Sequence, residues 1–143
     1  MQVESKLWQR LRKILNDSID VSKIIMIGDT KPLSTEVKAI PATTVLFGNA
    51  DTQNELYFMD SSRQFTSGVW ERPQSSYTKT NKADVFYYMI EGEIVIQNQY
   101  GDFTFIYPGR AYIVPAGFSG QWDVVKFTRQ FYARHQLEKS AGA

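Results

Sequence analysis

Between residues 20 and 136 the sequence has no sustained helical periodicity, and this absence constrains the fold more than any other feature. Short runs rich in β-branched and aromatic residues alternate with turn-forming residues about every eight to twelve positions, a pattern typical of an antiparallel sandwich or barrel. The predicted strands are residues 23–27, 43–47, 55–59, 64–71, 84–91, 93–98, 102–107, 110–114, 120–125 and 127–134. The sequence therefore predicts an all-β fold.

A chain of 143 residues is long enough for one hydrophobic core and matches the usual size of one domain. Residues 5–15 place apolar side chains at the spacing of one helical face, which predicts a short amphipathic α-helix. Residues 28–42 and 48–54 are rich in Gly, Pro, Asn and Asp and are predicted as loops. We expect the N-terminal helix within residues 1–19, a β-barrel over 20–136 and a disordered tail over 137–143.

Charge and composition exclude several classes of function. The net charge is +1, from 16 Lys and Arg against 15 Asp and Glu, so no long-range field would recruit nucleic acid or an anionic membrane. Cysteine is absent, which excludes disulfides and thiolate chemistry. The sequence has no signal-peptide pattern and no apolar run near the roughly 20 residues that span a bilayer. We expect a cytoplasmic protein with neither nucleic-acid nor membrane partners.

Glycine and proline mark the turns in the second half of the chain. Gly92, between two acidic residues, predicts a bend or bulge between two strands. Residues 98–102 predict a hairpin loop, and the Pro-Gly pairs within 107–110 and 115–118 predict two tight turns that bracket one short strand.

The order of these glycines and prolines resembles the cupin family. Gly109, Pro115 and Gly117 match the second cupin block, Gly-x5-Pro-x-Gly-x2-His, and Val85 to Glu93 looks like the end of the first block. The chain is most similar to small cupins of the ethanolamine-utilisation and ureidoglycine-aminohydrolase-like group, through Ser67 to Glu71 and Pro115 to Trp122. The similarity covers residues 64–134. It implies a cupin (jelly-roll) double-stranded β-helix barrel of the RmlC-like type.

The same resemblance implies where a cupin would hold its metal ion. The two histidines of the first block fall on Lys79 and Asn81, or with a longer spacing on Thr78 and Thr80. The glutamate falls on Val85 and the last histidine on Gly120. Valine and glycine have no side-chain donor atom, lysine repels a cation, and Thr or Asn alone binds transition metals weakly. We therefore expect no metal site and no cofactor.

Strand alternation predicts which residues line the barrel. Side chains with the parity of Val85, namely Tyr87 and Met89, should face the interior, while Phe86 and Tyr88 face outward. The interior would be aromatic and only lightly polar, and would suit an apolar or aromatic small molecule. The predicted ligand-binding residues are Trp70, Tyr87, Met89, Phe105, Gln121 and Trp122.

Catalytic candidates are few, and each has a structural alternative. Tyr87 could orient or protonate a ligand, or simply bond to backbone. Glu71 could act as a general base if burial raised its pKa, or lie at the surface. The lone His135 lies outside every motif, and residues 77–82 are predicted as a polar rim loop that is either solvated or in contact with an anionic ligand.

Three hypotheses about function remain open at the level of sequence. The first is a metal-independent cupin that binds a small organic molecule and acts as an isomerase, cyclase or lyase, or only binds. The second is a non-enzymatic, homodimeric accessory protein with a solid core that pairs through Phe86, Tyr88 and Ile90. The third is a metalloenzyme with the atypical ligands Gln121, Glu71 and His135.

Overall fold

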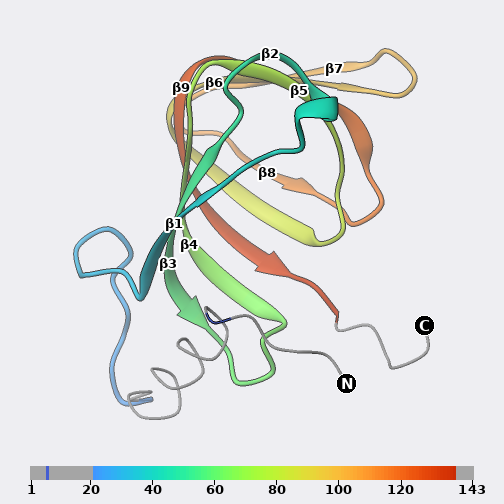
Figure 1. Ribbon diagram of the computed structural model, residues 1–143. Coiled ribbons are helices and arrows are strands. Elements are labelled where there is room, and N and C mark those ends of the chain that lie inside the picture. Colours follow the sequence, from blue (N-terminus) through green and yellow to red (C-terminus); the bar gives the residue numbers. More distant parts are fainter. Residues whose placement is uncertain (1–5, 7–20, 138–143) are drawn as a thin grey trace.

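The structure is a computed structural model that describes Lys6 and residues 21–137 (Figure 1). The predicted helix over 5–15 and the predicted tail beyond Leu137 lie outside these described residues, so both remain predictions. No helix in the described part of the chain is long and apolar enough to cross a bilayer.

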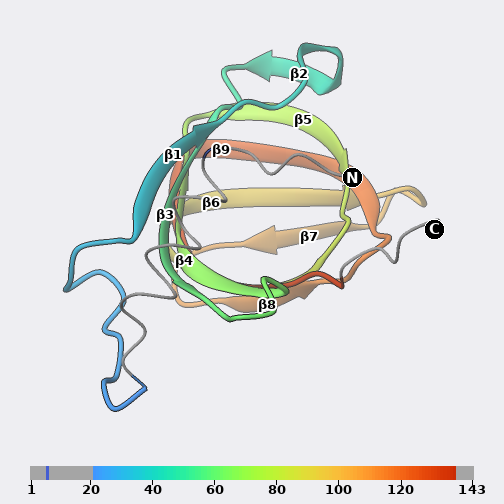
Figure 2. The ribbon, with the colours of Figure 1, turned by 60° about the horizontal axis from the view of Figure 1, so that its bottom comes forward.

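The described chain folds into one strongly curled antiparallel sheet whose strands surround a common interior (Figures 1 and 2). Its strands are β1 (Ser34–Lys38), β2 (Val45–Gly48), β3 (Thr52–Met59), β4 (Phe65–Arg72), β5 (Ser75–Thr80), β6 (Asp84–Asn98), β7 (Phe103–Ile106), β8 (Ala111–Val114) and β9 (Ser119–His135), with the short 3-10 helix η1 (Ala42–Thr44) before β2. This architecture confirms the predicted all-β, jelly-roll type of barrel.

The long strands β6 and β9 organise the barrel. On one side, β9 pairs with β6 from Asn98 opposite Gly120 to Asp84 opposite His135. On its other side, β9 pairs first with β5 and then with β4, while β6 carries β7 and β8 on its free edge. Because β6 and β9 are so long, each takes part in both halves of the barrel, and their pairing connects these halves.

Gly92 makes the bend that lets β6 serve both halves. The β6–β9 register shifts around Glu91 and Glu93, and Gly92 has φ +103°, which few other residues adopt. A Cβ at this position would lie 2.4 Å from Thr128 Oγ1 and 2.5 Å from the Phe127 carbonyl oxygen. The predicted bulge is confirmed, but residues 84–98 form one bent strand and not two separate strands.

The predicted turns are also confirmed. β6 and β7 form a hairpin, in which Asn98 Oδ1 accepts hydrogen bonds from the Tyr100 and Asp102 amides, both at 2.9 Å. The two Pro-Gly turns close through the Arg110 amide to the Tyr107 carbonyl and the Phe118 amide to the Pro115 carbonyl, both at 3.1 Å.

Three assignments made from the sequence are wrong. Residues 23–27 form no strand, although they are apolar, and β1 lies instead within the segment predicted as the loop 28–42. The predicted rim loop 77–82 begins as the second half of β5. Both β1 and β5 are rich in polar residues, so apolar runs could not reveal them.

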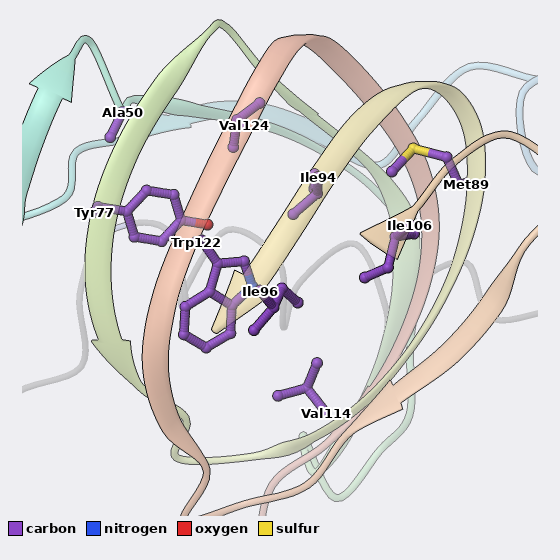
Figure 3. Packing of buried hydrophobic residues seen from close by; sticks show 9 residues of the cluster. All are labelled: Ala50, Tyr77, Met89, Ile94, Ile96, Ile106, Val114, Trp122 and Val124. Atoms are coloured by element: carbon purple, nitrogen blue, oxygen red, sulfur yellow. The ribbon is translucent and has the colours of Figure 1, made fainter. Parts of the chain in front are cut away.

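Much of the barrel is filled by an apolar core (Figure 3). Its buried members are Ala50, Tyr77, Met89, Ile94, Ile96, Ile106, Val114, Trp122 and Val124. Met89 and Ile94 are completely buried, and the Tyr77 and Trp122 rings stack 5.9 Å apart. The alternation predicted for β6 is confirmed, since Val85 and Met89 are buried while Phe86 and Tyr88 are exposed.

Candidate functional site at the cationic part of the barrel interior

Strand register identifies the side chains that share the inner face with this core. Lys38 pairs with Thr52, whose hydroxyl accepts a hydrogen bond from Arg72. Along the same face, Trp70 lies opposite both Asn54 and Gln130, and Tyr87 lies opposite both Tyr132 and Tyr112. This part of the interior therefore combines a cation, amides and aromatic rings, whereas the core beside it is aliphatic.

Arg72 is the central group of this region. Its side chain is 3% exposed, and its guanidinium carbon lies 4.5 Å from the Trp70 ring centroid and 4.2 Å from that of Tyr77. Apart from the bond to Thr52, Arg72 Nε and Nη1 are buried and find no acceptor in the part of the chain that the structure describes. Burial lowers the pKa of Arg72, and no carboxylate forms an ion pair with it among these residues. A buried cation with two unused donors is costly unless a ligand satisfies it.

Further cations surround the same space. Burial and the neighbouring charges of Arg72, Lys38 and Arg134 lower the pKa of Lys79 to about 8. Burial and Arg134 likewise lower the pKa of Lys38, against the opposing charge of Glu36. Lys79 remains exposed to water although protein atoms crowd its ammonium group, a combination expected on a concave surface. The site thus has an excess of positive charge even though the whole chain is nearly neutral.

Aromatic hydroxyls complete the lining. The Tyr87 ring stacks on Tyr112 at 5.1 Å and tilts against Trp70 at 6.1 Å, and all three side chains are only half-buried despite pointing inward. A minor part of each of these three side chains therefore stays accessible to solvent. Burial raises the pKa of both Tyr87 and Tyr112, so their hydroxyls stay protonated at neutral pH. The Tyr112 hydroxyl donates to Gln130, a buried amide.

The structure brings some of the predicted ligand-binding residues together. Trp70, Tyr87, Met89 and Trp122 all belong to the inner core or pack against it. Met89 is fully buried beneath the others, so it supports the wall more than it offers a contact surface.

Two other predicted ligand-binding residues lie elsewhere. Phe105 is 62% exposed on the outer face of β7, because Ile106 takes the inward position. Gln121 donates to Asp123 at 3.1 Å on the outer face of β9, because its neighbour Trp122 faces inward. Their predicted placement in the interior is wrong, because in each case the neighbouring residue on the strand takes the inward position.

The carboxylate predicted as a possible base also lies outside the barrel. Glu71 stands between the inward-facing Trp70 and Arg72, so it points outward, where its Oε1 lies 3.4 Å from Arg129 Nε. The surface alternative for Glu71 is the one that the geometry supports. Tyr87 is therefore the remaining catalytic candidate from the sequence inside the barrel.

The atypical metal set predicted as a third alternative does not assemble. Along β9, Gln121 comes first, then Arg129 with its partner Glu71, and then His135. The six residue steps from 129 to 135 alone extend about 20 Å. Within the described residues, no three side chains of His, Cys, Asp or Glu lie close enough to hold a metal ion.

The positions where a cupin holds its metal do not fit an ion either. Lys79 faces the interior opposite Gly120, and the nearby charges that act on it are all cationic. Asn81 is buried with its Oδ1 unpaired among the described residues, but one amide oxygen is a weak ligand. A Cβ at Gly120 would lie 2.5 Å from the Gln97 carbonyl oxygen, which leaves no room for a histidine there.

Sequence reasoning missed the cations Lys38, Arg72 and Arg134, and it named Lys79 only at a lost metal-ligand position and in a predicted rim loop that could contact an anionic ligand. The signal for Arg72 was present, because it lies two residues after Trp70 on the same strand and so shares its inward parity. Lys79 shares the parity of Tyr77 in the same way, but the strand itself was predicted as a loop.

An antiparallel jelly-roll barrel of this kind is the architecture of the cupin fold. The model of the EutQ-like cupin domain matches residues 59–132, and the chain belongs to this family. The match confirms the cupin resemblance and its ethanolamine-utilisation branch. No curated protein is significantly similar to this chain.

Solved structures agree on the fold. A protein of unknown function of the DUF861 family from Pseudomonas syringae pv. tomato is 19% identical with a TM-score of 0.65, over 71% of this chain and 44% of that one, so this chain spans less than half of its length. The Clostridium difficile EutQ protein is 21% identical with a TM-score of 0.56, over 72% and 83% of the two chains. The ethanolamine utilization protein EutQ of Salmonella typhimurium is 16% identical with a TM-score of 0.55, over 73% and 96%. At these identities the likeness concerns the fold alone.

Proposed function

We propose that this cupin binds a small organic acid inside its barrel, with Arg72 as the anchor for the acid's carboxylate. The observation that carries the proposal is the pair of buried donors, Nε and Nη1 of Arg72, that lack an acceptor within the described residues. A carboxylate accepts strong, charge-assisted hydrogen bonds from a guanidinium, and it would satisfy one of these two donors, which point to different sides of the group. Lys38 and Lys79 would add to the attraction.

The rest of the ligand is proposed to be flat and largely apolar. Trp70, Tyr87 and Tyr112 offer half-exposed ring surfaces beside the anchor, and such surfaces favour stacking with planar groups. This proposal keeps the aromatic ligand predicted from the sequence but gives it a negative charge, since the predicted interior lacked the four cations.

We also propose that binding needs no metal ion. The support is chemical, because the positions of the family's ligands hold Lys79, Asn81, Val85 and Gly120, and positive charge surrounds them. The negatively charged acid would occupy the position where the surrounding positive charge disfavours a metal ion. Elemental analysis after expression in metal-supplemented medium tests this directly, and a stoichiometric transition metal in the protein would contradict it.

Calorimetric titration with matched pairs of ligands tests the anchor. Phenylacetate and phenyllactate should bind, whereas 2-phenylethanol, which has the ring but no carboxylate, should not. Arg72→Met should weaken binding of the acids by about 10- to 150-fold, the range expected for lost hydrogen bonds to a charged group. Arg110→Met is the matched control, because Arg110 also lies over a tyrosine ring, 4.6 Å from the Tyr107 centroid, but in an exposed turn. Equal losses in both variants would refute the anchor.

As a second proposal, two copies of the chain associate through the outer face of β6 and β9. Phe86 and Tyr88 are 44% and 40% exposed there, and Tyr88 stacks on Phe131 at 6.4 Å. Ile25 and Met26 border the same groove, whose volume is about 510 Å³. Contiguous exposed aromatic surface of this kind is typical of protein interfaces.

Light scattering coupled to size exclusion checks the association. The unmodified protein should have the mass of a dimer, and Phe86→Lys should convert it to a monomer. Tyr100→Lys, in the hairpin loop where Tyr100 is 81% exposed, should leave the mass unchanged. A monomeric unmodified protein would end this proposal without affecting the barrel site.

A further inference from the structure

The position of Lys79 indicates a role beyond attracting the negative charge of the acid. On β5, Ser76 and Thr80 point outward, where they bond to Asp123 and Ser119, while Tyr77 is buried in the core. The alternation of the strand therefore directs Lys79 inward. It lies opposite Gly120 in the register of β5 and β9.

The surroundings of Lys79 favour a neutral amine. Every charge that acts on it, from Arg72, Lys38 and Arg134, is positive, and no carboxylate within the described residues forms an ion pair with it. These charges, together with burial, lower its pKa to about 8. About a tenth of such a side chain is unprotonated at pH 7, whereas an ordinary lysine has well under a thousandth in that form. Neighbouring cations and desolvation are the conditions that turn a lysine into a nucleophile.

We propose that Lys79 forms an imine with the carbonyl carbon of a 2-oxo acid whose carboxylate is held by Arg72. This inference rests on the proposed function, because it needs the acid anchored in the barrel. It names the substrate class as organic acids with a ketone next to the carboxylate.

The step is balanced without any further reagent. The neutral amine nitrogen attacks the carbonyl carbon, a C–N bond forms, and the carbonyl π electrons move to oxygen. That oxygen takes up one proton from the nitrogen and one from the surrounding water. It leaves as water while the nitrogen lone pair forms the second C–N bond, and the nitrogen retains one proton as a cationic imine. Tyr87 keeps its proton at neutral pH and lies near Arg72, so its hydroxyl can donate a hydrogen bond to the oxygen as its charge grows.

Reductive trapping tests the step on the full chain. The protein is incubated at pH 8 with pyruvate, 2-oxoglutarate or phenylpyruvate together with sodium cyanoborohydride, and the modified lysines are mapped by mass spectrometry. At least one acid should alkylate Lys79 at least about tenfold more than Lys126, an exposed lysine on the outer surface. Phenyllactate, which has the same ring and carboxylate but no ketone, should give no adduct.

Two variants separate chemistry from binding. Lys79→Arg keeps the positive charge, so it should still bind phenyllactate measurably, but it should form no adduct at position 79. Arg72→Met should reduce labelling of Lys79 at least about tenfold, because the acid is no longer held beside it.

The outcomes distinguish this inference from the proposed function. If phenyllactate binds through Arg72 but no oxo acid labels Lys79 above Lys126, the imine is refuted and the binding function stands. Labelling of Lys79 that Arg72→Met leaves unchanged also refutes it. If none of the acids binds, the proposed function itself fails and the imine fails with it.

Discussion

The barrel interior has two parts that follow opposite physical rules. Around Ile94, Ile106 and Val124 the interior is aliphatic and buried, and every contact there favours the folded state. Around Arg72 and Lys79 it is cationic and partly reachable by water, with donors left unpaired within the described residues. Burial in the first part stabilises the fold. The second part has the unpaired donors and concentrated charge on which the proposed binding site rests.

The largest expected effect concerns the aliphatic part. Ile94 is fully buried, so Ile94→Ala should lower the free energy of unfolding by about 2–5 kcal/mol through lost burial and a cavity. Urea denaturation measures this loss. Binding of phenyllactate by the protein that remains folded should hardly change, and a variant as stable as the unmodified protein would show that the core is not where the stability lies.

A smaller destabilisation is expected where the family's last metal ligand would lie. Gly120→Ala places a methyl group against the Gln97 carbonyl oxygen and should lower stability by about 1–3 kcal/mol. Gly120→His should be at least as destabilising and should gain no affinity for zinc or nickel in a metal titration. Tight metal binding by that variant would contradict the view that this site has no room or charge for an ion.

In the cationic part, a substitution should weaken ligand binding without lowering the stability of the fold. Arg72→Met removes a desolvated charge and supplies an apolar side chain of similar length, so the free energy of unfolding should stay the same or rise by up to about 2 kcal/mol. The same variant should lose affinity for acids. A variant that is strongly destabilised would show that Arg72 is a structural residue.

The smallest effect is a pH dependence that comes from Lys79. In the unfolded chain its pKa has the ordinary value of 10.5, and in the folded chain it is about 8. Between these values the unfolded state holds a proton that the folded state has lost, so the contribution of Lys79 to stability should rise with pH across this window. Because the side chain is exposed, the difference from Lys79→Met should not exceed about 1 kcal/mol. Denaturation curves of both proteins between pH 7 and 10 provide the comparison.

The two parts also differ in how well the sequence predicts them. Turn residues such as Gly92 and alternation in Val85, Tyr87 and Met89 led to the barrel and to much of its inner face, since local chemistry determines both. The polar strands β1 and β5 escaped because a strand that faces a polar interior has no apolar alternation. The cluster of Arg72 and Lys79 escaped as well, because residues from separate strands meet only once the sheet has curled.

A crystal structure of the protein with bound phenyllactate tests the central claim most directly. The account predicts the carboxylate within hydrogen-bonding distance of Arg72 Nε or Nη1, with the phenyl ring against Trp70, Tyr87 or Tyr112. An acid bound outside the barrel, or an Arg72 that keeps both donors turned away from an acid bound inside, would contradict it.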